Sequence, residues 1–540
     1  MNREVSTNKQ PAQESGAFGI DPIALEVFNY RLGAIAEEMG VTLCRSAFSP
    51  NIKERRDFSC ALFDAAGELV AQAAHIPVHL GSTPLSVRAA ITQCVIQPGD
   101  VIVLNDPYAG GTHLPDVTVV APVFHGPRLV GYVANRAHHA DIGGMSPGSM
   151  PLATEIYQEG LRLPPVHLLR RGRMVQDVLA IFLANTRVLE QRRGDLLAQV
   201  AALRVGQSRL SELIRRDGAS RVGIAMRALQ TYSERLMRAA LRRFPTGTYR
   251  AVDYLDDDGE GSRALRIAVT VELSGGRARV DFAGTSAQAR GGVNTNLAVT
   301  LASVYYVFRA LAARSIPANA GMMRPIEVKG PKGSLVNAEF PAAVAGGNVE
   351  TSQRIVDVLL RALARARPLE IPAASCGSMN NLAFGGSDPL RRRSFSYYET
   401  IAGGAGGGPS GPGCSALHTH MTNTWNTPIE AIESELPVRI VRYNVRRGSG
   451  GRGRHAGGDG IVREIEFLTR ARVTLLTERR RFAPFGARGG GPGKRGANNL
   501  VRHGRVSALP GKISLTVEKG ERLRVATPGG GAWGVRKRRH

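Results

Sequence analysis

The stretch NDPYAGGTHLPDVTVV, residues 105–120, decides how the first half of the chain folds. It follows a short β-branched run, turns through a proline and a glycine pair, and enters a second β-branched run. Proline fixes φ and glycine permits positive φ, so the backbone of this turn is restricted. We therefore expect His113 and Asp116 to lie on a rigid turn between two strands.

A second turn of the same kind follows the next predicted strand, residues 129–137. That strand ends in His138, His139 and, three residues after His138, Asp141, before another glycine pair. Two successive strand ends thus each present a histidine and an aspartate at the same spacing. Imidazole and carboxylate groups on short turns are typical ligands of Mn, Zn or Fe. The alternative is that these histidines are solvated loop residues or hydrogen-bonded core groups.

The rest of the chain reads as alternating blocks of helices and strands. Asp21-Pro22 supplies an N-cap and a proline at the first position of a helix that runs to about residue 40. Further helices are predicted at 174–243 (two or three), 297–313 and 350–366. A β-hairpin is predicted around the turn at 64–67. Strands are predicted at 100–105, 117–124, 129–137, 247–255, 266–273, 276–283, 438–445, 461–468, 472–477, 513–517 and 521–526. Glycine clusters at 403–413, 448–460, 489–496 and 529–531 are interpreted as turns rather than phosphate-binding loops.

This pattern predicts an α+β protein with several domains, mostly antiparallel or mixed sheets, long helices and a β-rich C-terminal region. A chain of 540 residues exceeds what one hydrophobic core usually holds. We divide it into a disordered tail (1–19), a metal-bearing α+β domain with long helices (20–245), a central α+β domain (246–437) and a β-rich basic C-terminal domain (438–540).

The composition argues against two classes of function. The net charge is +25, and residues 441–540 hold 24 Lys+Arg against 6 Asp+Glu, yet aromatics are only 6% and no DNA- or RNA-binding motif is present. We therefore expect no nucleic-acid partner. No run approaches the roughly 20 apolar residues of a membrane span, the N-terminus lacks a signal peptide, and the five cysteines show no paired spacing. We expect a cytoplasmic protein without a membrane partner.

Several motifs, in order, resemble those of the hydantoinase B/oxoprolinase family over almost the whole chain from about residue 20. They are RRDFSCALFD (55–64), HIPVHLGS (75–82), NDPYAGGTHLPD (105–116), RAHHADIGG (136–144), AGGNVETSQR (345–354), YYETIAGG (397–404), HTHMTNTWNTPIEAIE (418–433), GGDGIVRE (457–464) and TPGGGAWG (527–534).

The resemblance implies a subunit of a hetero-oligomer whose partner is a hydantoinase A-like ATPase subunit. That partner would use ATP to phosphorylate the carbonyl oxygen of a small cyclic amide, such as 5-oxoproline or a hydantoin. By similarity to the related ketone carboxylases, the divalent metal would be held by His113, Asp116 and His138. His139 competes for the third position, and Asp141 would be a further ligand or an orienting residue.

The chemistry of the amide suggests why a metal is needed. An amide carbonyl is a poor electrophile, and phosphorylating its oxygen while a metal activates water and polarises the carbonyl corrects this. His418 and His420 are candidates for substrate positioning or acid–base work, and His75 and His79 could extend the metal site. Asn348, Glu350 and Ser352 open a predicted helix that could hold an anion.

Two other functions remain open from the sequence. The nearest is an ATP-dependent ketone carboxylase of the acetone or acetophenone type, built on the same metal site. The other is a non-catalytic assembly or nucleic-acid-binding subunit, which the basic C-terminus favours. The leading interpretation is a hydrolase acting on carbon–nitrogen bonds in cyclic amides.

Overall fold

The first layer of the protein is a seven-stranded antiparallel sheet with strand order β2-β1-β5-β4-β3-β6-β7. The computed structural model describes residues 20–536 apart from 74 and 313–314, so the predicted disordered tail lies outside the described residues. The strands are β1 (Phe58–Asp64), β2 (Leu69–Gln72), β3 (Val101–Leu104), β4 (Asp116–His125), β5 (Arg128–His138), β6 (Val166–Arg170) and β7 (Arg173–Met174). The predicted α+β class with antiparallel sheets is confirmed.

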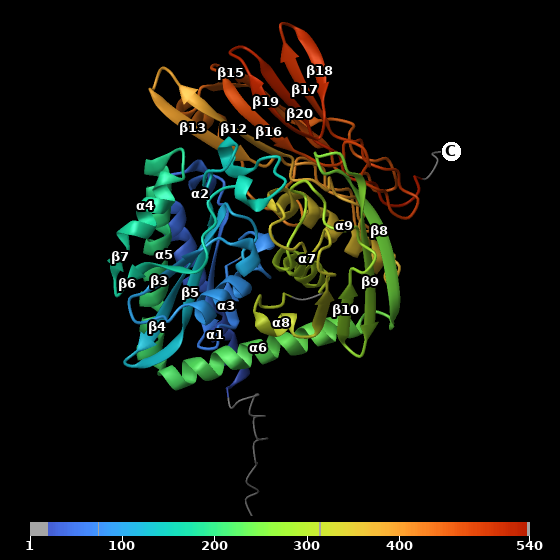
Figure 1. Ribbon diagram of the computed structural model, residues 1–540. Coiled ribbons are helices and arrows are strands. Elements are labelled where there is room, and N and C mark those ends of the chain that lie inside the picture. The colour runs from blue at the N-terminus through green and yellow to red at the C-terminus, as the bar shows by residue number, and fades with distance from the viewer. Residues whose placement is uncertain (1–19, 74, 313–314, 537–540) are drawn as a thin grey trace, which may run out of the picture.

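Helices cover both faces of this sheet (Figure 1). On one face α1 (Pro22–Ser46) and α5 (Leu189–Asp217) pack against side chains such as Leu62 and Val119, with α4 (Gln176–Ala184) beside α5. On the other face α3 (Thr83–Gln93) packs against the alternate side chains, such as Phe63 and Val120. Successive strand residues point to opposite faces, which explains why these strands are apolar at nearly every position.

Helix α1 begins as predicted, because the Asp21 side chain accepts a hydrogen bond from the backbone N–H of Ala24. It extends to Ser46, beyond the predicted end. Its buried face is made by residues such as Phe28 and Leu32, whereas Ile23 is 75% exposed.

The second layer is a four-stranded sheet with order β11-β10-β9-β8. Its strands are β8 (Gly247–Asp257), β9 (Arg263–Ser274), β10 (Arg277–Asp281) and β11 (Ile326–Lys329). Helices α7 (Leu297–Ala310) and α9 (Ser352–Leu363) lie between this sheet and the first layer, and α8 (Ala320–Met323) packs on α6 (Ala219–Arg242). Figure 1 shows α6 running along the base from one layer to the other.

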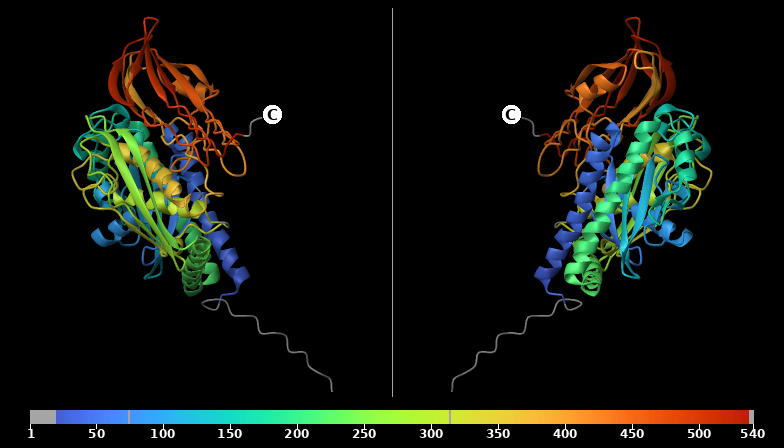
Figure 2. Two further views of the ribbon diagram at one scale, coloured as in Figure 1. Left: turned by 90° about the vertical axis from the view of Figure 1, so that its right-hand side faces the viewer. Right: turned by 90° about the vertical axis from the view of Figure 1, so that its left-hand side faces the viewer.

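Two further sheets form the C-terminal part, which caps one end of both layers (Figures 1 and 2). Their orders are β13-β12-β16-β19 and β14-β15-β20-β17-β18, and one apolar core lies between them. The strands are β12 (Asn381–Asp388), β13 (Arg393–Glu399), β14 (Val438–Arg446), β15 (Gly460–Phe467), β16 (Ala471–Leu476), β17 (Ala497–Arg502), β18 (Arg505–Leu509), β19 (Lys512–Val517) and β20 (Arg522–Ala526). Because β12 pairs with β16, the predicted boundary at 437/438 falls between segments that share a sheet.

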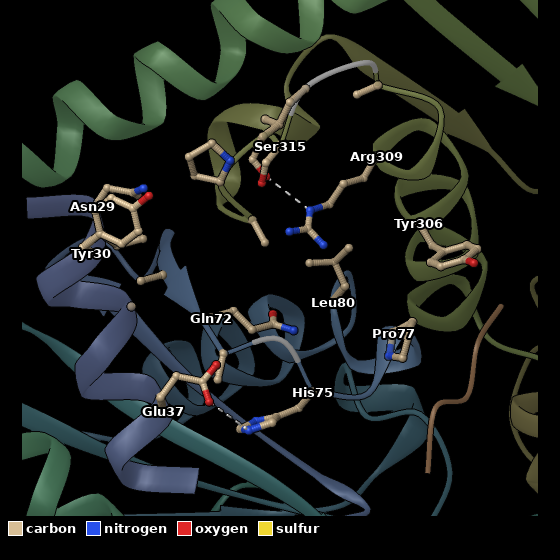
Figure 3. Close-up of a pocket in the computed structure, with 18 of the residues that line it drawn as sticks. Asn29, Tyr30, Glu37, Gln72, His75, Pro77, Leu80, Tyr306, Arg309 and Ser315 are labelled. Carbon is tan, nitrogen blue, oxygen red and sulfur yellow. Dashed lines mark hydrogen bonds and ion pairs between the residues drawn. The ribbon is translucent and has the colours of Figure 1, made fainter. Parts of the chain in front are cut away.

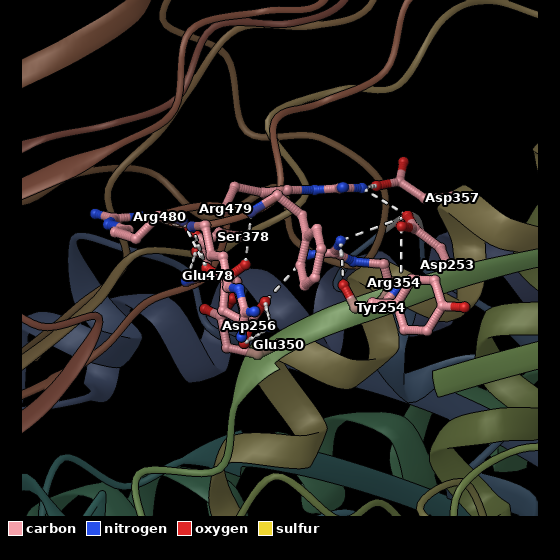
Figure 4. Close-up of polar contacts among 12 residues, drawn as sticks. Asp253, Tyr254, Asp256, Glu350, Arg354, Asp357, Ser378, Glu478, Arg479 and Arg480 are labelled. Carbon is pink, nitrogen blue, oxygen red and sulfur yellow. Dashed lines mark hydrogen bonds and ion pairs between the residues drawn. The ribbon is translucent and has the colours of Figure 1, made fainter. Parts of the chain in front are cut away.

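A chain of buried ion pairs ties the central sheet to the C-terminal sheets (Figure 4). Arg354 of α9 lies 3.4 Å from Asp253 of β8 and 3.2 Å from Glu478. Arg479 lies 3.0 Å from Asp253 and 2.5 Å from Asp357 of α9. Removing one partner of such a buried pair leaves the other charge buried and unpaired, which typically lowers the stability of the fold by about 3–5 kcal/mol. These pairs therefore couple the C-terminal sheets to α9.

The four glycine clusters form a closely packed lattice of backbone segments rather than separate turns. Gly404 donates its N–H to the Pro528 carbonyl, Gly458 to Ala405, and Gly530 to Gly458. A Cβ added at Gly404 would lie 1.9 Å from the Gly458 oxygen, and one at Gly530 would lie 2.0 Å from the Ala405 oxygen. Only glycine lets the segments approach this closely, so the glycine clusters serve to pack these backbone segments against one another.

We expect Gly530→Ala to destabilise the protein by at least about 1–3 kcal/mol, the usual cost of overpacking a well-packed region. Gly411→Ala is the matched control, since nothing lies within 4 Å of a Cβ added there. Apparent melting temperatures of both variants measure the difference. Equal melting temperatures for Gly530→Ala and Gly411→Ala would contradict the conclusion that close packing of these segments requires glycine.

Candidate metal centre

The register of the β4–β5 pair places Asp116 directly opposite His138. His113 lies on the turn before β4, and its Nε2 is 3.3 Å from Asp116 Oδ2. One ligand atom from each of these three residues lies within 4.8 Å of the others, and all three are buried. The structure thus brings together the three residues that resemblance assigned to the metal.

The polar atoms of this cluster fit a bound cation. Within the described residues, no hydrogen-bond partner is found for either ring nitrogen of His113, for Nε2 of His138 or for Oδ1 of Asp116. Most buried polar groups in proteins are hydrogen-bonded, so such a concentration of unsatisfied atoms requires an explanation. The space among them is about 20 Å³, which is enough for a single ion or water.

The electrostatics of the cluster also suit a divalent ion. Burial would raise the pKa of Asp116, but His113 and His79 beside it hold that pKa well below its usual value. Burial, together with the neighbouring His113, lowers the pKa of His138 well below its usual value. The site therefore presents a carboxylate and a neutral imidazole, which are the protonation states that metal ligation needs.

Neighbouring side chains hold the ligands in place. The Asn51 amide lies 2.9 Å from His138 Nδ1, and the Tyr398 ring stacks on the imidazole with centroids 4.6 Å apart. The Asn51 side-chain nitrogen faces this Nδ1, and the Asn51 side-chain oxygen accepts a hydrogen bond from Arg55 at 3.0 Å, so Asn51 is itself held in place. Thr112 donates its hydroxyl to Asp116 Oδ2, which leaves Oδ1 as the free oxygen.

Of the two histidines suggested as extensions of the metal site, His79 adjoins it and His75 does not. His79 Nε2 lies 3.5 Å from Asp116 Oδ2, and its Nδ1 is 2.8 Å from the Ser59 hydroxyl. His75 instead lies 3.7 Å from Glu37 of α1.

Asp57 is a cavity residue that the sequence did not single out. It precedes β1, and the backbone N–H of His138 donates to its carbonyl. Its side chain lines the cavity, where burial raises its pKa and Arg55 offsets part of the rise. In the sequence, Asp57 was marked only by its place in the motif at 55–64. Its proximity to His138 results from strand pairing, which a local pattern does not show.

His139, the competing ligand, points to the opposite face of the sheet. Its Nε2 lies 2.9 Å from the Gln199 side-chain oxygen on α5, and its ring packs edge-on to Phe182. It is not part of the ligand cluster.

Asp141 is likewise bound elsewhere. Its carboxylate pairs with Arg187 at 2.9 Å and accepts hydrogen bonds from the backbone of Gly143 and Gly148 and from Ser396. These contacts hold the loop after β5 against β13. Asp141 does not line the metal cavity, and a catalytic role for it stays a prediction.

The two histidines of the 418–420 segment lie outside the cluster. Burial lowers the pKa of His418 to about 4. His420 has a left-handed backbone, with φ of 59°, its Nε2 is 3.7 Å from Asp357, and its Nδ1 is 3.4 Å from the Tyr306 hydroxyl. Burial would raise the pKa of Asp357, but His420 and Arg479 hold it below its usual value. Acid–base or positioning roles for both histidines stay predictions.

The motif that opens α9 divides between two environments. Asn348 lines the metal cavity, and its side-chain oxygen has no hydrogen-bond partner among the described residues. Glu350 instead accepts hydrogen bonds from Asn381 and the Met379 backbone, and burial raises its pKa to about 8. Ser352 donates to the Asn348 carbonyl.

We expect His138→Ala to lose bound metal and His139→Ala to retain it, because His138 faces Asp116 whereas His139 points away from it to Gln199 of α5. Metal content after dialysis against Mn, Zn or Fe salts measures the difference, with circular dichroism as a check on folding. Loss of metal from His139→Ala alone would reverse the assignment.

His139 also predicts a pH dependence of stability. Burial, followed by Arg192, lowers its pKa to about 4, whereas an unfolded histidine titrates near 6.5. Between those values the unfolded chain binds a proton that the folded chain does not, so stability falls as the pH falls. At about 1.4 kcal/mol per pH unit, His139 contributes a loss of about 2 kcal/mol between pH 6.5 and 5. His139→Gln should show a smaller drop in melting temperature over that range than the wild type, and an equal drop would refute this origin.

Comparison with known proteins shows one matching family, and relatives and solved structures that resemble this chain over most of its length. The Hydantoinase B/oxoprolinase model matches residues 21–536. The 5-oxoprolinase 1 of Arabidopsis thaliana is 42% identical over 95% of this chain, and the chain spans 42% of its length. The ATP-dependent caprolactamase of Pseudomonas jessenii superposes with a TM-score of 0.90 at 31% identity, covering 96% of this chain and 91% of that one.

An acetone carboxylase structure shares the fold, with a TM-score of 0.88 at 18% identity over 95% of this chain and 76% of the other. None of the helices in the described part of the chain is long and apolar enough to span a membrane. The family match covers nearly every residue that builds the sheets and the cluster at His113, Asp116 and His138, and the protein therefore belongs to the hydantoinase B/oxoprolinase family.

Proposed function

We propose that this chain is the hydrolytic subunit of an ATP-dependent enzyme that opens a cyclic amide such as 5-oxoproline or a hydantoin. The observation that carries the proposal is the buried cluster of His113, Asp116 and His138, in which the His113 ring nitrogens, Asp116 Oδ1 and His138 Nε2 have no hydrogen-bond partner within the described residues. The likeness to 5-oxoprolinase 1 and to the caprolactamase supports the same class of reaction.

In this proposal His113, Asp116 and His138 hold a divalent ion, Mn, Zn or Fe. When bound, the ion would activate water and polarise the substrate carbonyl. Asp116 contributes the negative charge, and Asn51 and Tyr398 fix the His138 ring. Asp57 places a second buried carboxylate beside the reacting groups, where its raised pKa suits proton exchange with water. The rest of the cavity lining is partly apolar and includes Ile76, Val78, Val349, Met379 and Met421.

The ATP-dependent step is assigned to a partner, a hydantoinase A-like ATPase subunit in a hetero-oligomer. The chain spans only 42% of 5-oxoprolinase 1, which leaves room in that protein for a second activity. The sequence contains no Walker phosphate-binding loop, and N–H groups of the glycine clusters such as those of Gly404 and Gly458 are donated to neighbouring carbonyls. Activation by phosphorylation of the carbonyl oxygen would therefore precede the step carried out here.

We expect His113→Ala and Asp116→Ala to reduce turnover of 5-oxoproline by the assembled enzyme to background, while partner binding is retained. Either change removes a ligand from a cluster of three. His125→Gln is the matched control, because His125 lies exposed at the opposite end of β4. Coupled measurement of ATP hydrolysis and ring opening tests this, and full turnover by either alanine variant would refute the proposed function.

A ketone carboxylase is the alternative, supported only by the fold shared with acetone carboxylase. It is distinguished by assaying the same complex with 5-oxoproline, hydantoin and caprolactam, and separately with acetone and bicarbonate. Turnover of acetone alone would replace cyclic-amide hydrolysis with carboxylation.

A further inference from the structure

A large groove lies between α1 and α7, on the other side of a thin wall from the metal cavity (Figure 3). Its volume is about 1040 Å³, ample for a small cyclic compound. We call it the α1–α7 groove. Its lining includes Glu26, Asn29 and Glu37 of α1, His75, and Arg309 of α7.

The wall between groove and cavity is one turn of chain. Ile76 lines both spaces, and in the following 3₁₀ turn, η2 (Pro77–His79), Pro77 faces the groove while His79 faces the cavity. The segment before Asn423 forms the rest of the wall, and the Asn423 amide donates to the His75 carbonyl at 3.0 Å. The groove therefore adjoins the metal cavity across this wall.

Arg309 is the notable residue of the groove. It lies in the last turn of α7, its side chain is half-buried, and Figure 3 shows its guanidinium projecting into the space. Its Nε donates to the Ile316 carbonyl at 3.3 Å. Among the described residues no carboxylate lies within 4 Å of it, and burial lowers its pKa.

A half-buried guanidinium without an acidic partner is costly, because it loses hydration and gains little in return. Its planar donors match the two oxygens of a carboxylate or a phosphoryl group. The facing wall on α1 carries hydrogen-bond acceptors, including Glu26 and the side-chain oxygen of Asn29, and Glu37 lies 3.7 Å from His75. The groove thus has a positively charged side on α7 and a side on α1 that offers hydrogen-bond acceptors.

We propose that the α1–α7 groove is an initial binding site for the substrate beside the metal cavity, and that Arg309 pairs there with an anionic group of the cyclic amide. The anion is the ring's own carboxylate, as in 5-oxoproline, or the phosphoryl group added to its carbonyl oxygen. The amide N–H of the ring would face the acceptors on α1. This inference rests on the proposed function and adds a binding site for the substrate outside the metal cavity, with Arg309 as the residue that recognises its anionic group.

The turnover test compares two substrates that share a ring, 5-oxoproline and 2-pyrrolidinone, which lacks the carboxylate. We expect Arg309→Gln to lower kcat/KM for 5-oxoproline by about 10- to 100-fold, mainly through KM, because one charge-assisted hydrogen bond is lost. Arg309→Lys should restore part of the loss. Arg88→Gln, at an exposed arginine on α3, is the control and should leave both substrates unaffected.

The two substrates identify the source of the anion. A loss confined to 5-oxoproline assigns the carboxylate, and an equal loss with 2-pyrrolidinone assigns the phosphoryl group. Unchanged kcat/KM for both substrates in Arg309→Gln overturns the inference while leaving the proposed function standing.

A binding measurement separates this inference from the proposed function. Calorimetric titration of the purified chain with 5-oxoproline, and separately with inorganic phosphate, should show binding of at least one probe that Arg309→Gln weakens about 10-fold or more. That result supports binding in the α1–α7 groove even if no ring opening is found. Failure of the wild-type chain to bind either probe, or equal binding by Arg309→Gln, overturns it.

Discussion

The candidate metal site depends on one constraint, the register of the antiparallel pair β4–β5. That register sets Asp116 opposite His138 and sends both side chains to the face that η2 and α3 cover. Strand side chains alternate with a period of two, so a slip of one residue would turn His138 away and bring His139 to the cavity. The buried neighbours of both strands fix the register, since a slip would also turn Thr118 and Arg136, which hydrogen-bond to each other beside α3, toward the apolar contacts with α5. A packing requirement of the core therefore selects the ligand.

The cavity is completed only where all three parts of the protein meet. Its lining includes Asp57 just before β1, Asn348 before α9, Tyr398 from β13 and Met421 from the following loop. The buried ion pairs around Arg354 and Arg479 and the glycine lattice hold the C-terminal sheets against α9, and so hold the last two of these residues in place. Fold stability and site geometry are thereby coupled over long sequence distances.

Much of the fold could be predicted because its signals are local. The N-cap at Asp21, the hairpin at 64–67 and the apolar strands that became β4 and β5 all carry their pattern in a few residues. The strands β12, β13, β17 and β18 were not predicted, since they are glycine-rich, polar or exposed and gain their order from partner strands. The glycine clusters were interpreted as turns because a sequence does not show which backbone segments will pack together.

For this protein the sequence by itself determined the class of fold, the family resemblance and the ligand types, because residue chemistry and spacing along a strand or turn are local properties. Only the tertiary structure decided that His138 rather than His139 faces Asp116, that Asp57 and His79 join the cavity, and that Asp141 is bound to Arg187. These facts follow from strand pairing and from contacts across the chain, and no local pattern encodes which distant side chain will fill a given space.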